Sequence, residues 1–101
     1  MGAFVKVAKK SQIPEDTGFR VEVGGKEIAL FKVAGKIYAI CAVCPHQGGP
    51  LDEGGLHGDQ VMCPWHGWEF SVTTGKCSFN DAFKLPVYKV REEGDNIFVE
   101  V

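Results

Sequence analysis

The chain has 101 residues, the length of a single domain, and 45% of them are hydrophobic, as is ordinary for a globular protein. The formal net charge of −2, with no basic run longer than Lys9-Lys10, argues against a nucleic-acid partner. No apolar stretch approaches the ~18 residues that cross a bilayer, and the N-terminus lacks the apolar region of a signal peptide. We therefore expect a soluble, cytoplasmic protein that does not bind a membrane.

Short alternating segments separated by Gly-rich turns follow one another along the chain. Gly24-Gly25 predicts a two-residue hairpin turn, because such turns need positive φ angles. The strand after this turn is expected to bury Ile28 and Leu30. Pro86 interrupts an alternating run near the end of the chain and predicts an edge or bulged strand there. The predicted strands cover residues 4–8, 19–23, 27–33, 37–40, 61–62, 68–72, 85–90 and 97–101.

Regular structure is not expected between these strands. The stretches 47–50 and 52–55 are rich in Gly and turn formers, 80–82 is a predicted loop, and no segment has extended helical periodicity. Many short strands with Gly-rich turns are typical of an all-β fold, an antiparallel β sandwich or barrel. We expect one domain over residues 1–101.

Two cysteines and two histidines form a paired motif. Cys44-Pro45-His46 is followed by sixteen residues and then by Cys63-Pro64-Trp65-His66. Two disulfides in a secreted protein are an alternative use of four cysteines, but the missing signal peptide and the histidines at ligand spacing favour a metal. Thiolate and imidazole suit zinc, copper or an iron–sulfur cluster. Because zinc motifs usually group Cys with Cys and His with His, the mixed pairs favour a dinuclear cluster, with zinc as the alternative.

The extended motif, C-P-H-Q-G-G-P-L and C-P-W-H-G-W-E-F, resembles that of the Rieske [2Fe–2S] proteins, and the likeness to a free-standing Rieske ferredoxin covers the whole chain. The resemblance implies a Rieske-like fold with a small cluster-binding subdomain at about residues 41–72. It also implies one [2Fe–2S] cluster per chain. By the same likeness, Cys44 and Cys63 would hold the inner iron, and His46 and His66 the outer iron.

One branch of this family differs from the chain at informative positions. The Rieske proteins of bc-type complexes carry a disulfide between the two ligand loops, where this chain has Gly49 and Trp65. That branch also has a Ser and a Tyr whose hydroxyls bond to the cluster sulfurs, where this chain has Trp68 and Phe70. Because such hydrogen bonds raise the potential, the resemblance implies the low-potential type, near roughly −150 mV.

Electron transfer is the function that the resemblance implies. A Rieske cluster has no open coordination position, and the chain has neither room for an oxygenase catalytic domain nor a G-x-G-x-x-G nucleotide signature. We therefore expect a redox carrier that is not itself an enzyme and has no catalytic residues. Its donor would be a flavin reductase and its acceptor a terminal oxygenase. The alternatives are a small Rieske subunit of an NAD(P)H-dependent nitrite reductase and a structural zinc-binding module.

Other residues near the motif have simpler explanations. Cys41 and Cys77 are expected to be free thiols, buried or half-buried. His57 lies outside the ligand spacing and is predicted to be an exposed loop residue. Acidic groups that could steer a basic partner, but are more commonly solvated turn formers, are Asp52, Glu53 and Asp59. Predicted packing residues around the metal are Pro50, Leu51, Trp65, Trp68 and Phe70.

Overall fold

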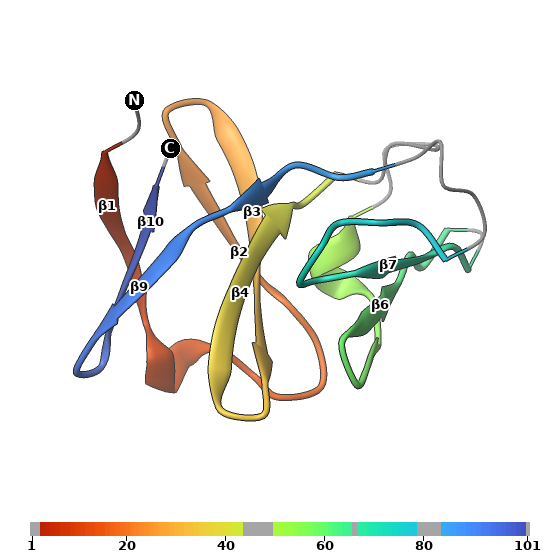
Figure 1. Cartoon of the computed structure of the whole chain (residues 1–101), viewed down its shortest axis with the longest axis horizontal. Coiled ribbons are helices and arrows are strands. Elements are labelled where there is room, and N and C mark those ends of the chain that lie inside the picture. The colour runs from red at the N-terminus through yellow and green to blue at the C-terminus, as the bar shows by residue number, and fades with distance from the viewer. Residues whose placement is uncertain (1–2, 44–49, 66, 79–83, 101) are drawn as a thin grey trace.

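The computed structural model describes residues 3–43, 50–65, 67–78 and 84–100, and within them three antiparallel sheets lie in a row (Figure 1). The first sheet has the order β1 (Phe4–Lys9), β10 (Asn96–Glu100), β9 (Val90–Glu93). The second has the order β2 (Phe19–Val23), β3 (Lys26–Val33), β4 (Lys36–Cys41), β8 (Val87–Tyr88). The third has the order β5 (Leu56–His57), β6 (Gln60–Met62), β7 (Glu69–Ser71). The predicted all-β class is confirmed.

Tight hairpins connect the strands of the second sheet. Gly24 and Gly25 have φ angles of 58° and 81°, and the ladder closes directly on both sides of them, as predicted. The next hairpin places Ala34 at φ 51° and Gly35 at φ 79°. A side chain is strained at such an angle, so Ala34 is held there by the pairing of β3 with β4.

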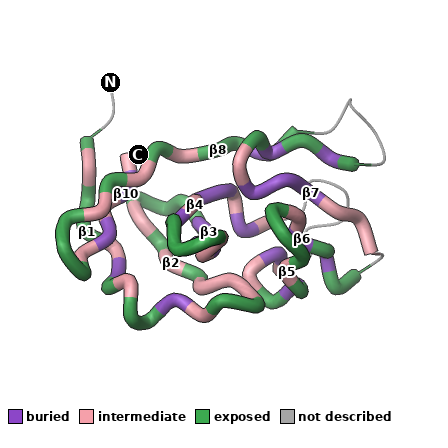
Figure 2. The backbone as a smooth tube through the Cα atoms, turned by 60° about the horizontal axis from the view of Figure 1, so that its bottom comes forward, coloured by how far each residue is buried: buried purple, intermediate pink, exposed green. Residues whose placement is uncertain are grey.

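The middle strands of the second sheet, β3 and β4, carry most of its buried residues. Along β3 the four consecutive residues Ile28–Phe31 are fully buried. Ile28 and Leu30 belong to the core shared with the first sheet, whereas Ala29 and Phe31 belong to the core shared with the third. Figure 2 shows buried residues running through the middle of the molecule and into β7. A continuous apolar run is the pattern that a strand between two layers requires.

The predicted edge or bulged strand near Pro86 is confirmed in an interrupted form. Val87–Tyr88 forms β8, which pairs with β4 at the edge of the second sheet. After Lys89 the chain continues as β9, which pairs with β10 in the first sheet. Proline cannot donate to a ladder, and Pro86 lies just before the short edge strand, where a donor is not needed.

Two 3₁₀ turns and one short strand were not predicted. They are η1 (Lys10–Gln12), η2 (Leu51–Glu53) and β5. The η2 turn corrects the expectation that 52–55 would be wholly irregular: the amide of Gly54 closes it on the carbonyl of Leu51 at 3.0 Å. The predicted loop at 80–82 lies outside the described residues. None of the helical segments in the described part of the chain could cross a membrane.

Candidate metal centre

Cys63 is the one predicted ligand that the structure describes. It follows β6 directly, as the sequence predicts, and is only 2% exposed. Its neighbours in the core include Val61 and Phe70. The other three predicted ligands, Cys44, His46 and His66, lie outside the described residues.

A tight turn holds the chain around Cys63. The amide of Cys63 donates to the carbonyl of Trp68 at 2.6 Å, and the amide of Gly67 donates to the carbonyl of Cys63 at 3.1 Å. Gly67 has φ +73°, which glycine adopts without strain. These bonds fix both ends of the segment that carries the second Cys–His pair.

The segment that carries the first Cys–His pair is closed at its base. Val43 and Pro50, the described residues on either side of 44–49, form an antiparallel bridge. Next to this bridge, the amide of Leu51 donates to the carbonyl of Ala42 at 2.9 Å. The first ligand segment therefore leaves the end of β4 and returns directly into η2.

The η2 turn reaches from the base of the first ligand segment to the strand that precedes Cys63. A Cβ added to Gly54, which ends η2, would lie 2.0 Å from the carbonyl oxygen of Met62. The next residue, Gly55, accepts a hydrogen bond from the amide of Met62 at 3.0 Å. Only glycine fits at this close backbone approach, so the spacing between the two ligand segments depends on Gly54.

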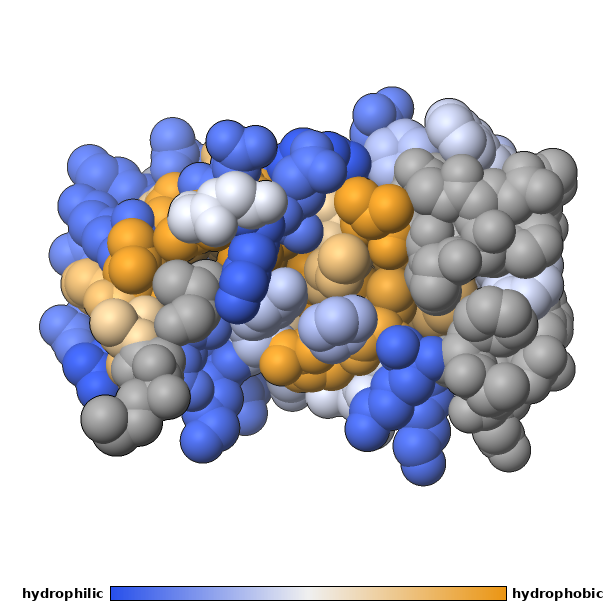
Figure 3. Space-filling model, turned by 90° about the horizontal axis from the view of Figure 1, so that it is seen from above, coloured by the Kyte–Doolittle hydropathy of each residue, from blue (hydrophilic) through white to orange (hydrophobic). Residues whose placement is uncertain are grey.

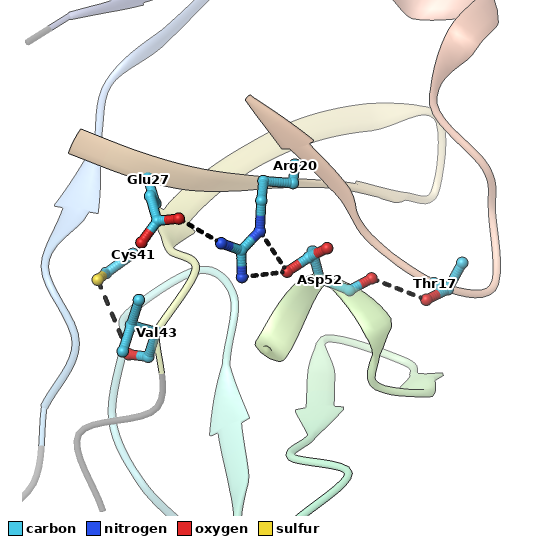
Figure 4. A network of polar contacts seen from close by, with 6 residues as sticks. All are labelled: Thr17, Arg20, Glu27, Cys41, Val43 and Asp52. Atoms are coloured by element: carbon cyan, nitrogen blue, oxygen red, sulfur yellow. Dashed lines mark hydrogen bonds and ion pairs between the residues drawn. The ribbon is translucent and has the colours of Figure 1, made fainter. Parts of the chain in front are cut away.

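A polar network fixes η2 to the second sheet (Figure 4). The guanidinium of Arg20 donates from Nε to Oδ1 of Asp52 at 3.0 Å, and its Nη1 lies 2.5 Å from Oε1 of Glu27. The hydroxyl of Thr17 lies 3.0 Å from the carbonyl of Asp52 and 2.9 Å from that of Gly54, within hydrogen-bond reach of both. The hydrogen bond to Asp52, together with the nearby carboxylates, raises the pKa of Arg20.

This network could not be found in the sequence. Asp52 was expected to be a solvated turn residue or a steering charge, but its side chain is only 13% exposed and paired with Arg20. The two residues are separated by 32 positions and belong to no motif. Only the fold brings them together.

The predicted shielding residues divide into two groups. Leu51 and Phe70 are fully buried in the core that contains Cys63, and Trp68 packs against that core. Trp65 is the exception, because it is 51% exposed. It is neither in that core nor packed against it, so its expected packing role is wrong.

The remaining cysteines and histidine agree with most expectations. Cys77 is buried and Cys41 half-buried, and neither forms a disulfide. The thiol of Cys41 lies 3.8 Å from the carbonyl of Val43. His57 is exposed as predicted, although it lies in β5 rather than in a loop.

These features fit a soft metal centre. A thiol lies at the end of β6 in an apolar core, and the base of the first Cys–His segment is anchored through η2 to the same strand. Thiolate and imidazole donors of this kind suit iron–sulfur clusters and zinc rather than Mg²⁺ or Ca²⁺.

Comparisons with known proteins favour an iron–sulfur cluster over zinc. The family described as "Rieske [2Fe-2S] domain" matches residues 3–89. The chain is 38% identical over 99 residues to the ferredoxin component of the naphthalene 1,2-dioxygenase system of Pseudomonas putida, covering 97% of this chain and 95% of that protein. Two solved structures are also similar. One is a complex of reduced oxygenase and oxidized ferredoxin in carbazole 1,9a-dioxygenase, with TM-score 0.84, 33% identity, and coverage of 94% of this chain and 99% of that one. The other is a putative NADH-dependent nitrite reductase small subunit from Mycobacterium tuberculosis, with TM-score 0.92, 22% identity, and coverage of 100% and 96%.

Proposed function

Since the chain belongs to the Rieske [2Fe–2S] domain family, we propose that it is a ferredoxin that carries one electron from a flavin reductase to a terminal oxygenase. The observation that carries this proposal is the 38% identity, over nearly the whole of both chains, to the ferredoxin component of a dioxygenase system. The resemblance to the ferredoxin of a ferredoxin–oxygenase complex supports the same acceptor class. In this proposal residues 1–101 form one cytoplasmic carrier domain without catalytic residues of its own.

Four residues would hold the cluster: Cys44, His46, Cys63 and His66. When bound, a [2Fe–2S] cluster takes up and releases a single electron. The role of the described residues is to keep the donors in place and to exclude water. Cys63 supplies a thiolate from a buried position, and Leu51 and Phe70 fill the apolar core around it. A dry, apolar surrounding is a recognised means of tuning such a centre.

A protein partner suits the surface next to Cys63. Met62 and Trp65, on either side of the Cys63-Pro64 pair, are 37% and 51% exposed. Aromatic residues and methionine are enriched in protein–protein interfaces, where their apolar area adapts to a partner. Apolar side chains are also exposed elsewhere: on the face seen from above, they lie among hydrophilic ones in the middle of the molecule (Figure 3).

The two alternatives have less support. The similarity to a nitrite reductase small subunit is 22% in sequence, which establishes a common fold only. A structural zinc module would use the same four donors, but the family match and the ferredoxin relative favour iron and sulfide.

The nature of the centre can be tested directly on the isolated protein. We expect a red-brown protein with two iron atoms and two acid-labile sulfides per chain, and a Rieske-type EPR signal after reduction. Colourless protein with stoichiometric zinc would contradict the proposal. Transfer of electrons from a reduced flavin reductase to the ferredoxin, and from it to an oxygenase rather than to a nitrite reductase, distinguishes the two carrier functions.

Ligand variants test the assignment of the four residues. His46→Cys or His66→Cys is expected to shift or abolish the Rieske spectrum while the β-scaffold stays folded. His57→Cys is the matched control, since His57 is exposed on β5 and outside the motif. Unchanged spectra in both ligand variants would rule out this assignment.

A further inference from the structure

Both ligand segments are held by contacts of described residues. The second is closed on itself by the hydrogen bonds between Cys63 and Trp68 and between Gly67 and Cys63. The first is closed at its base by the bridge between Val43 and Pro50, and behind that base the chain enters η2. The position of η2 therefore sets where the base of the first segment, at Val43 and Pro50, lies relative to the second segment.

The η2 turn contacts both segments. At its start, Leu51 donates to Ala42 beside the Val43–Pro50 bridge. At its end, Gly54 lies against the carbonyl of Met62, the residue before Cys63. A displacement of η2 would thus be transmitted to both ligand segments at once.

The second sheet holds η2 through its polar face. Arg20, on β2, contacts Oδ1 of Asp52 from both Nε and Nη2, at 3.0 and 2.9 Å. Thr17, just before β2, lies within hydrogen-bond distance of the carbonyls of Asp52 and Gly54. The amide of Gly18 also donates to the carbonyl of Asp52 at 2.9 Å. One residue of η2 is therefore bonded through both its side chain and its backbone.

The orientation of Arg20 is itself fixed. Glu27, on the neighbouring strand β3, contacts the other side of the guanidinium at 2.5 Å. Two opposed carboxylates leave the planar group one orientation, and a lysine ammonium could not reproduce this geometry. Its position is set by the β2–β3 ladder, which lies outside the metal centre.

We infer that Arg20 and Thr17 are positioning residues for the metal centre, acting through Asp52 and η2 on both ligand segments. This inference rests on the proposed function, because it needs a cluster held between the two segments. In this inference, the contacts of Arg20 and Thr17 with η2 set the separation of the two ligand segments, although neither residue is a ligand.

Cluster release measures the effect. Purified, cluster-loaded protein is mixed with an iron chelator, and the loss of visible absorbance is followed. We expect Arg20→Gln to accelerate release about five- to thirty-fold, since a change of one or two kcal/mol corresponds to such a factor. The reduction potential and the EPR g values should also shift, because the donors change their arrangement.

Thr17 provides a test with a built-in rescue. Thr17→Val keeps the shape of the side chain but removes the hydroxyl, and should accelerate release. Thr17→Ser keeps the hydroxyl and should release the cluster at the wild-type rate. The comparison of Thr17→Val with Thr17→Ser tests the positioning role even if Arg20→Gln does not fold.

Two controls separate positioning from general loss of stability. Arg91→Gln removes a guanidinium from an exposed pair with Glu93 at 3.5 Å. Glu92→Gln weakens an ion pair with Lys10, which lies on η1 away from the ligand segments. Both should release the cluster at the wild-type rate.

Three results would overturn the inference. They are wild-type release and spectra in Arg20→Gln and Thr17→Val, equal acceleration in the controls, and failure of Thr17→Ser to restore the slow rate. If the wild type itself holds no cluster, the proposed function fails and this inference with it. A loaded wild type with unaffected variants defeats this inference alone.

Discussion

At the scale of single residues, the aromatic side chains around Cys63 have opposite environments. Phe70 is fully buried and lies in the same core as Cys63, whereas Trp65 is 51% exposed. The sequence alone predicts that both side chains pack, because aromatic residues near a metal motif are commonly part of a core. The exposure of Trp65 in the structure is what places it outside that core.

We predict that these two aromatics contribute very differently to stability. Phe70→Ala should lower the free energy of unfolding by about 3–5 kcal/mol, because it removes a large buried side chain and leaves a cavity. Trp65→Ala should change it by less than about 0.5 kcal/mol. Urea unfolding followed by circular dichroism measures both, and similar losses in the two variants would contradict this reading.

At the scale of elements, one carboxylate joins three of them. The carboxylate of Glu92, on β9, lies 2.8 Å from the ammonium of Lys10 on η1. It also accepts a hydrogen bond from the amide of Ile37 on β4 at 3.2 Å. The hydrogen bond from Lys10, aided by that from Ile37, holds the pKa of Glu92 below its usual value, while burial opposes this shift. The contact links the first and second sheets.

The lowered pKa predicts a pH-dependent contribution to stability. Because Glu92 ionises more readily in the folded chain, its contribution is complete above the unfolded pKa of about 4.3 and is lost as the pH falls through the folded pKa. Glu92→Gln should therefore cost about 1 kcal/mol at pH 7, and less as the solution becomes more acidic. Urea unfolding of the wild type and the variant between pH 7 and 3 tests this. A difference that grows in acid would contradict it.

Most strands were predictable because their signals are local. The hairpin at Gly24-Gly25 needs only its two glycines, and the alternation of β2 and β10 shows directly in the sequence. In contrast, η2 is stabilised by Arg20 and Thr17, which are remote in sequence, and its own residues resemble an irregular turn. The candidate site has the same division: its four predicted donors form a recognisable motif, whereas the described contacts around η2 join residues that are far apart in the sequence.

At the scale of the whole molecule, the surroundings of the centre favour a low reduction potential. Phe70, in the core that contains Cys63, and Trp68, packed against that core, have no hydroxyl to donate to a cluster sulfur. We predict a midpoint near the lower end of the Rieske range, roughly −150 mV rather than +300 mV. A redox titration that gives a strongly positive midpoint would refute this.

A matched pair of hydroxyl insertions tests the cause. Phe70→Tyr adds a hydroxyl within the core around Cys63 and should raise the midpoint. Phe19→Tyr adds the same group on β2, at a partly buried position packed against the core that joins the first two sheets. The second variant should leave the midpoint unchanged, and equal shifts in both would show that the effect is not local.

The pairing of β1 with β10 has a practical consequence. Phe4 lies opposite Glu100, so the two described ends of the chain are neighbours in the first sheet. That sheet and the third sheet, which delivers Cys63, lie at opposite ends of the molecule (Figure 1). A tag, a tether to an electrode or a fused reductase could therefore be attached at either of these chain ends and leave the end with Cys63, where the proposed cluster lies, uncovered.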